Sequence, residues 1–225
     1  MPAPISIVIP TLDAGQGLGR CLEALMEGLP LGLIREVIVS DGGSTDNTLL
    51  IADEAGADVV SGPASRGGQL RRGCGAARGE WVMIVHADTI LMPGWAEVVR
   101  EHVESSRQGA YFRLAFRAPG LMPRLVAGWA NARAGLLSLP FGDQGLLLPR
   151  VMYEKSGGYP DQPLMEDVAL VRSLPRLVGL PVVAMTGADR YLRQGWMRRG
   201  ARNLWTQARY FAGTDPERLA EGYRR

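Results

Sequence analysis

The chain has 225 residues, of which 46% are hydrophobic and 21% charged, which is typical of a globular protein with a substantial core. Its 25 Lys and Arg residues nearly balance its 23 Asp and Glu residues, and a net charge of +2 does not indicate a nucleic-acid partner. No signal peptide is visible and no uncharged apolar run reaches the roughly 18 residues that span a bilayer, so a cytoplasmic protein without a transmembrane segment is expected.

The first half of the chain alternates between the periods of strands and helices. Strands are expected at 5–10, 34–39, 57–61 and 81–85, and helices around 18–25, at 46–55 and at 69–77. The first strand is a β-branched run, as in a buried parallel strand. The alternation predicts an α/β protein with a doubly wound, mostly parallel sheet and helices on both faces.

The second half of the chain is less regular. Strands are expected at 110–116, 144–148 and 182–185, and helices at 121–139, 167–177 and 198–212. No linker, repeat or low-complexity tract interrupts the sequence, so residues 1–225 are interpreted as one domain with two functional halves, 1–90 and 91–225. Cys21 and Cys74 lack a partner at metal-ligand spacing and are expected to be buried thiols in a reducing compartment.

Carboxylates follow three of the expected strands, at Asp13, Asp41 and Asp88. Ligands of open parallel sheets bind beyond the carboxyl ends of the strands, so these side chains are expected to face one crevice. Ser44 and Asp46 are interpreted as caps of the following helix. A buried carboxylate needs a partner, and for Asp41 and Asp88 a metal or ligand is the preferred explanation.

Two nucleotide-binding signatures are absent. No Gly-x-Gly-x-x-Gly turn follows the first strand, and no Gly-x-x-x-x-Gly-Lys-Ser/Thr loop occurs anywhere in the chain. A hydride-transfer enzyme or a phosphate-loop hydrolase would need one of them, so both classes are disfavoured.

Residues 6–11 (SIVIPT), 39–46 (VSDGGSTD), 86–88 (HAD) and 165–167 (MED) together resemble family 2 glycosyltransferases with the GT-A (Rossmann-like) fold. The resemblance covers nearly the whole chain. It is closest to a bacterial subgroup with a His-Ala-Asp metal motif, which also carries 142–145 (GDQG), 157–160 (GGYP) and 163–167 (PLMED).

The resemblance implies a donor site in the first half. Asp41 would bind the base or ribose, with Pro10, Thr11 and Asp13 lining the same pocket, and Asp88 would hold Mg²⁺ or Mn²⁺ on the diphosphate. His86 replaces the first aspartate of the usual Asp-x-Asp motif. A ribose contact, an auxiliary metal ligand and a packed histidine are its alternatives.

The resemblance also implies residues around the reacting sugar. Asp167 would be the general base, with Glu166 as second choice, although both would also suit the first turn of a helix. Arg66 and Gln69 would face the donor from a glycine-rich helix start. Arg190 is carried over from a Gln-x-x-Arg-Trp motif whose order is not kept here.

The acceptor side is less defined. Asp143 and Gln144 are expected to line it. Met122, Leu125, Val126 and Trp129 form an apolar stripe at helical spacing, which is expected to be core. A lipid-linked acceptor, or peripheral docking at the inner membrane helped by the basic segment 198–209, is the alternative.

The residues and the resemblance together predict an inverting glycosyltransferase that uses a nucleotide diphosphate sugar, a UDP- or GDP-sugar, and an unidentified acceptor. A sugar-nucleotide nucleotidyltransferase is an alternative, but it needs a basic residue in the loop after the first strand, and none occurs before Arg20. A non-catalytic nucleotide-sugar-binding protein is a second alternative, supported only by His86.

Overall fold

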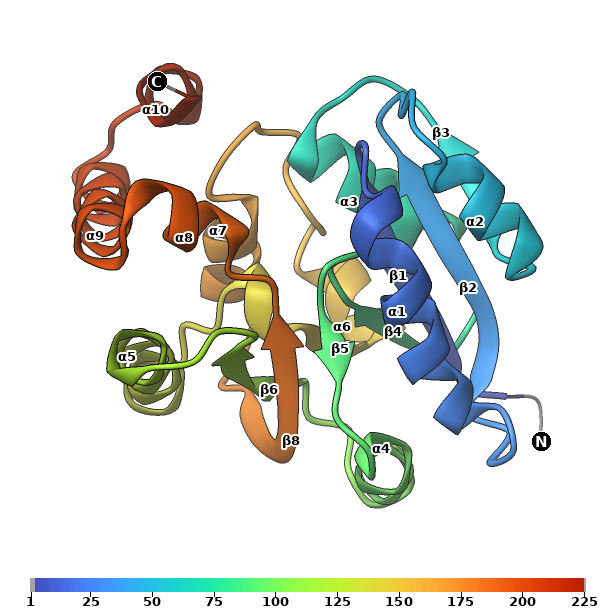
Figure 1. Cartoon of the computed structure of the whole chain (residues 1–225). Coiled ribbons are helices and arrows are strands. Elements are labelled where there is room, and N and C mark those ends of the chain that lie inside the picture. The colour runs from blue at the N-terminus through green and yellow to red at the C-terminus, as the bar shows by residue number, and fades with distance from the viewer. Residues whose placement is uncertain (1–2, 225) are drawn as a thin grey trace.

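The computed structural model describes residues 3–224, in which one continuous sheet is flanked by helices (Figure 1). The strands are β1 Ile5–Thr11, β2 Ile34–Asp41, β3 Asp58–Ser61, β4 Trp81–Ile84, β5 Ile90–Leu91, β6 Ala110–Phe116, β7 Leu146–Pro149 and β8 Val178–Thr186. The helices are α1 Gly15–Leu25, α2 Thr48–Glu54, α3 Arg66–Ala76, α4 Trp95–Ser105, α5 Leu121–Leu137, α6 Arg150–Lys155, α7 Glu166–Ser173, α8 Asp189–Gln194, α9 Trp196–Phe211 and α10 Pro216–Arg224. Two short 3₁₀ turns lie at Met26–Gly28 and Gly142–Gln144.

The sheet has the order β3-β2-β1-β4-β7-β6-β8-β5. Strands β3, β2, β1 and β4 are parallel, β7 pairs antiparallel with both β4 and β6, and β6 pairs parallel with β8. The carboxyl ends of β1, β2 and β4 therefore meet at one edge, where ligands of parallel sheets bind.

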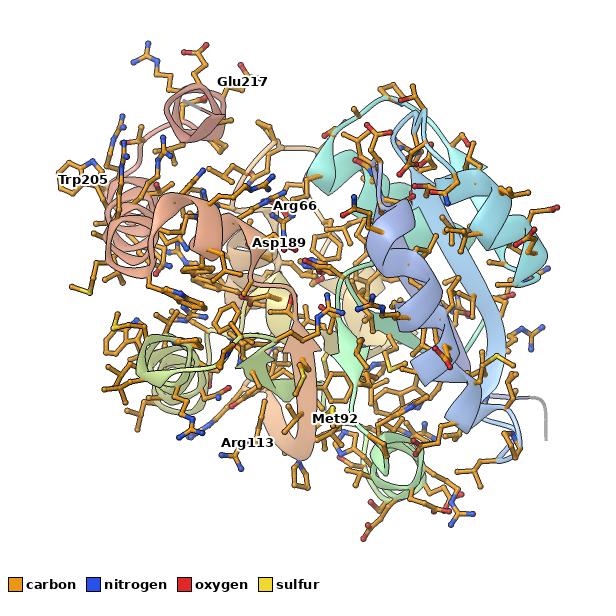
Figure 2. All side chains as sticks on the ribbon, in the orientation of Figure 1. Arg66, Met92, Arg113, Asp189, Trp205 and Glu217 are labelled. Atoms are coloured by element: carbon orange, nitrogen blue, oxygen red, sulfur yellow. The ribbon has the colours of Figure 1, made fainter. Side chains whose placement is uncertain are left out.

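Two hydrophobic cores cover the two faces of the sheet, because side chains alternate along each strand. Ile5, Ile7 and Ile9 of β1 pack under α1, α2 and α4, whereas Val8 packs on the opposite face with α3, α6 and α7. Side chains fill the space between these layers (Figure 2). Cys21 and Cys74 are buried free thiols, one in each core, as predicted.

The predicted fold class, an α/β protein with a mostly parallel sheet and helices on both faces, is confirmed.

Several boundaries in the second half differ from the sequence prediction. The strand expected at 144–148 begins only at Leu146, because residues 142–144 form a 3₁₀ turn and Gly145 has a φ of +63°. The helix expected to reach 177 ends at Ser173, since Leu174 is extended ahead of Pro175. Strand β8 is longer than predicted, and β5, α4, α6, α8 and α10 were not predicted.

The apolar stripe on α5 is mostly not core, which corrects the preferred interpretation. Leu125 and Trp129 are 55% and 56% exposed. The buried side of α5 instead carries the small residues Ala127, Ala130 and Ala134, which allow close packing against the sheet. No helix in the described part of the chain has the length and apolar character needed to cross a bilayer.

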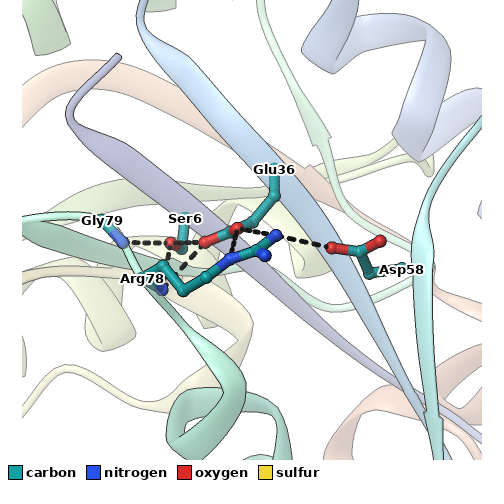
Figure 3. A network of polar contacts seen from close by, with 5 residues as sticks. All are labelled: Ser6, Glu36, Asp58, Arg78 and Gly79. Atoms are coloured by element: carbon teal, nitrogen blue, oxygen red, sulfur yellow. Dashed lines mark hydrogen bonds and ion pairs between the residues drawn. The ribbon is translucent and has the colours of Figure 1, made fainter. Parts of the chain in front are cut away.

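A polar network holds together the strand ends opposite the ligand edge (Figure 3). Glu36 of β2 is 9% exposed and accepts hydrogen bonds from Ser6 Oγ, from the Arg78 backbone N at 2.9 Å and from Arg78 Nε at 2.6 Å. Arg78 also contacts Asp58 at 3.1 Å. Burial alone would raise the pKa of Glu36, but the hydrogen bonds from Ser6 and Arg78 outweigh it and lower the pKa.

Replacing Glu36 with glutamine is expected to reduce the free energy of unfolding at pH 7 by about 1–3 kcal/mol, because an amide nitrogen would face the donors of Arg78. A carboxyl whose pKa is lowered by folding stabilises the protein above its unfolded pKa, and this contribution is lost as the pH falls below its ordinary value of 4.5. Urea unfolding of the parent and of Glu36→Gln from neutral to acidic pH should therefore converge at low pH. The exposed Glu80→Gln variant is the control, and a pH-independent difference would contradict the prediction.

Candidate functional site

The loops that follow β1 and β2 are joined to each other by side-chain hydrogen bonds. Asp13 Oδ1 accepts from the Thr45 backbone N at 2.8 Å, and Asp46 Oδ2 accepts from the Gly15 backbone N at 2.9 Å. Asp46 Oδ1 also accepts from the first amide of α2, at Thr48, although the N-cap position is Asn47; Ser44, the other predicted cap, donates to Asp41 instead. Asp13, which is exposed, therefore contributes to the shape of this loop pair.

Asp41 finds its partners within the chain, so the expectation that a metal or ligand explains its burial is wrong. It is 1% exposed and accepts from Thr11 Oγ1 at 3.0 Å, from the backbone N of Gly43 and Ser44 at 2.7 and 2.8 Å, and from Ser44 Oγ. Burial would raise the pKa of Asp41, but these hydrogen bonds lower it. Its carboxylate holds the 41–44 turn in place.

Gln69 also has a structural role that the sequence did not reveal. Its side chain is 5% exposed, and Nε2 donates to the carbonyl of Thr11 at 2.6 Å and to that of Ser40 at 3.3 Å. It thereby joins the ends of β1 and β2 to α3. Its amide nitrogen points at the sheet rather than at a donor pocket.

Arg66, the first residue of α3, connects the two halves of the chain. Its Nε lies 2.8 Å from Glu166 Oε1 at the start of α7, and its NH2 lies 3.3 Å from His86 Nε2 after β4. Figure 2 shows Arg66 in the centre of the molecule, between α3 and the C-terminal helices. The arginine predicted to face the donor thus joins the metal-motif segment to the predicted base segment.

His86 is a neutral, half-buried histidine. Burial, followed by the charges of Arg66 and Arg190, lowers the pKa of His86 to about 3. Because Arg66 can only donate, the neutral ring accepts at Nε2. Because Nε2 contacts Arg66, the structure favours a histidine held in place by Arg66 over one that binds a metal through Nε2. Arg190 is exposed on α8, close enough to influence His86.

Asp88 is exposed, as Asp13 is, whereas Asp41 is buried, so the burial expected of Asp88 is not found. Thr186 Oγ1 is 3.4 Å from its Oδ1, and Arg117 donates to its backbone carbonyl at 3.2 Å. A Cβ at Gly187 would lie 3.2 Å from Asp88 Oδ2 and 3.4 Å from Asp189 Oδ2, so glycine leaves space beside both carboxylates. Asp88 is therefore accessible to a ligand.

Asp167 and Glu166 differ in their surroundings although they are adjacent. Asp167 is half-buried, and its Oδ2 accepts from the Gly142 backbone N at 2.8 Å. Glu166 is 1% exposed. Burial raises the pKa of Glu166, Arg66 opposes that shift, and the charge of Asp167 adds to it. Met165, directly before α7, has a φ of +62°, which is uncommon for a residue other than glycine.

Asp143 and Gln144, which were predicted to line the acceptor side, have different surroundings. Gln144 is fully buried, and its Nε2 contacts the Phe112 carbonyl at 3.4 Å and Asn131 Oδ1 at 3.3 Å, so it supports the fold and does not line an open site. Burial raises the pKa of Asp143 to about 6, with the Arg133 charge opposing the shift and Asp167 adding to it. Within the described residues, Asp143 Oδ1 and Glu166 Oε2 are buried without a hydrogen-bond partner.

Three residues of the site, Thr186, Arg117 and Arg133, were missed, and Gly142 was noted only as part of a motif. Thr186 and Arg117 contact Asp88, Gly142 contacts Asp167, and Arg133 lies 3.4 Å over the Phe141 ring beside Asp143. Thr186 could have been found by the strand-end rule, because it directly follows the strand expected at 182–185. A Cβ at Gly142 would lie 2.8 Å from His86 Nε2, so glycine is required there by close approach.

The oxygen ligands at this edge suit a divalent cation only in part. No group of three or more His, Cys, Asp or Glu side chains in the described residues could hold a metal ion by itself. Asp88 offers a hard carboxylate oxygen, which suits Mg²⁺ or Mn²⁺, ions that retain water or phosphate oxygens as further ligands. The residues present therefore fit a cation whose remaining ligands come from a bound substrate and water.

Sequence comparison matches the model of the family described as Glycosyl transferase family 2 to residues 6–120, more than half of the chain. Glucosyl-3-phosphoglycerate synthase of Mycolicibacterium paratuberculosis is 38% identical over 95 residues, which are 38% of this chain and 29% of that protein. The chain thus spans less than a third of the length of this curated relative.

Solved structures share the fold. A crystal structure of a mycobacterial protein is 26% identical, with a TM-score of 0.56, over 90% of this chain and 74% of that one. Glucosyl-3-phosphoglycerate synthase from Mycobacterium tuberculosis, in complex with Mn²⁺, uridine diphosphate and phosphoglyceric acid, is 24% identical, with a TM-score of 0.53, over 82% of this chain and 69% of that one.

Proposed function

This chain belongs to glycosyl transferase family 2, and from that premise we propose that it transfers a sugar from a nucleotide diphosphate donor to an acceptor hydroxyl, with inversion and a divalent cation. One observation carries the proposal. Arg66 contacts both His86 of the metal motif and Glu166 beside the predicted base, so the cation and base segments lie around one space. Residues 1–90 would bind the donor, and 91–225 the acceptor.

The donor is proposed to be a uridine diphosphate sugar. The mycobacterial synthase with the same fold binds uridine diphosphate, which favours uridine over guanosine. Pro10, Thr11, Asp13 and Asp41 would form the base pocket. In this role the carboxylates of Asp13 and Asp41 would hold the conformation of the loops after β1 and β2, because both already accept hydrogen bonds from backbone amides. The nucleotide base would then contact backbone groups and the residues around Thr11.

The cation is proposed to bind Asp88, which is exposed at this edge. When bound, it would neutralise charge on the diphosphate and so improve the leaving group. The Mn²⁺ and Mg²⁺ complexes of the mycobacterial synthase support a divalent ion of this kind. Arg66 and Arg190 would add positive charge on the side of His86.

Asp167 is proposed as the general base. It would take the proton of the acceptor hydroxyl while that oxygen bonds to the anomeric carbon and the bond between sugar and diphosphate breaks. The Gly142 amide fixes the orientation of this carboxylate. Glu166 is already paired with Arg66, so it would position the arginine rather than accept the proton. Asp143, with an unpartnered buried oxygen, would bind a hydroxyl of the acceptor or the sugar.

Calorimetry with UDP, GDP and UTP, each with and without Mn²⁺, tests the proposal. We expect Mn²⁺ to strengthen UDP binding by at least about tenfold, and UDP to bind better than GDP or UTP. A preference for UTP would instead favour a nucleotidyltransferase. Tight UDP binding without transfer or hydrolysis of any UDP-sugar would favour a non-catalytic binding protein.

A further inference from the structure

Helix α9 exposes large apolar side chains on its outer side. Its inner side carries polar residues beside the inward-packed Trp196 and Tyr210: Arg199 and Thr206 are 5% and 6% exposed, Arg199 NH1 is 3.1 Å from Gln194 Oε1, and Asn203 Nδ2 is 3.0 Å from Tyr191 Oη. Its outer side carries the large apolar residues Met197, Leu204, Trp205 and Phe211, which are 75%, 48%, 66% and 47% exposed. Figure 2 shows Trp205 pointing away from the body of the molecule.

Helix α5 lies beside α9 and also exposes large apolar side chains. The two helices contact each other and occupy the same edge of the molecule (Figure 1). On the outer side of α5, Leu121, Leu125 and Trp129 are 68%, 55% and 56% exposed and recur every four residues. We call the outer residues of both helices the α5–α9 face: Leu121, Leu125 and Trp129 with Met197, Leu204 and Trp205. Large apolar side chains exposed together on two neighbouring helices are typical of an interaction site.

The charged residues on the two helices of this face are all positive. Helix α9 contains four arginines and no acidic residue, and α5 likewise contains no aspartate or glutamate. Arg198 and Arg124 are exposed at the borders of the apolar residues. A second copy of the chain would bring arginine-rich borders against each other across a two-fold axis, which is unfavourable. An anionic surface complements both the charge and the apolar residues.

We propose that the α5–α9 face docks on an anionic lipid bilayer. Leucine and methionine side chains would enter the boundary between headgroups and acyl chains, and the two tryptophans would lie at the level of the headgroups, where their amphipathic rings are favoured. The bordering arginines would bind anionic headgroups. Docking uses residues separate from the proposed base and metal ligand, so it can be tested without any assay of sugar transfer.

Vesicle flotation of the full chain tests the proposal. We expect binding to vesicles of phosphatidylcholine mixed with phosphatidylglycerol, weak binding to phosphatidylcholine alone, and release when NaCl is raised from about 0.05 to about 0.5 M. Trp205→Gln and Trp129→Gln should each weaken vesicle binding by at least about tenfold. Leu50→Gln, at a residue 59% exposed on α2, is the matched control and should bind as the parent does.

Other results would overturn the proposal. Equal binding by Trp205→Gln, Trp129→Gln and the parent would exclude this face as the docking surface, as would an absence of binding to anionic vesicles. Sedimentation velocity without vesicles tests whether a second copy of the chain covers this face instead. A parent dimer that Trp205→Gln converts to monomer would assign the face to that second copy. Both tryptophans are exposed, and circular dichroism would verify that the variants are folded.

Discussion

Replacing Asp167 with asparagine is expected to lower turnover by about 10²–10⁴-fold while UDP and Mn²⁺ still bind with nearly the parent affinity. Asparagine keeps the size of the side chain and can still accept from the Gly142 amide, which lies 2.8 Å from Oδ2. It cannot take a proton from the acceptor. The loss should therefore appear in kcat, measured by release of UDP from a UDP-sugar, and calorimetry should show intact donor binding.

Two neighbouring carboxylates serve as matched controls for Asp167→Asn. Asp143→Asn removes a charge close to Asp167, and Glu166→Gln removes the partner of Arg66. Both are expected to reduce turnover by a smaller factor than Asp167→Asn, because neither removes the group that accepts the proton. Full activity of Asp167→Asn combined with an inactive Glu166→Gln would transfer the base role to Glu166.

Replacing Asp88 with asparagine is expected to abolish the enhancement of UDP binding by Mn²⁺ and to lower turnover by about 10²–10⁴-fold. The substitution removes the carboxylate charge that a hard cation needs. It should leave the fold intact, since Asp88 is exposed and the contact of its side chain with Thr186 is long, at 3.4 Å. Calorimetric titration of UDP at increasing Mn²⁺ concentrations measures the effect.

Asp189 provides the control for Asp88→Asn, because its Oδ2 lies on the other side of the space that glycine leaves at position 187. Asp189→Asn changes the local charge by the same amount and is expected to reduce the Mn²⁺ effect only slightly. If Asp189→Asn abolished the Mn²⁺ effect and Asp88→Asn did not, the cation would have to be assigned to Asp189 and the central role of Asp88 given up.

Much of the first half of the fold was predictable because its signals are local. Buried parallel strands are short β-branched runs, and β1, β2, β3 and β4 each begin or end within about two residues of the sequence prediction. Helix α4 was missed although Trp95, Val99 and Val103 recur every four residues and are buried. Strand β5 has only two residues, Ile90–Leu91, and is stabilised by pairing with β8, so no local pattern could predict it.

The candidate site was predictable as a set of residues but not as a set of contacts. The strand-end rule placed Asp41 and Asp88 at the same edge. Whether each carboxylate binds a ligand or a neighbour depends on strand register: Thr11 pairs with Asp41 across β1 and β2, which supplies a donor to the Asp41 carboxylate. Asp88, by contrast, meets Thr186 from β8, which is remote in sequence.

The sequence by itself determined the α/β alternation, the order of the motifs, and the family that these motifs resemble. The tertiary structure decided which carboxylates are paired within the chain, that Arg66 joins His86 to Glu166, and which sides of α5 and α9 face outward. The physical reason is that helical periodicity identifies an apolar stripe without saying what covers it. On α5 close packing against the sheet favours the small side chains of Ala127, Ala130 and Ala134, and this leaves Leu125 and Trp129 outside.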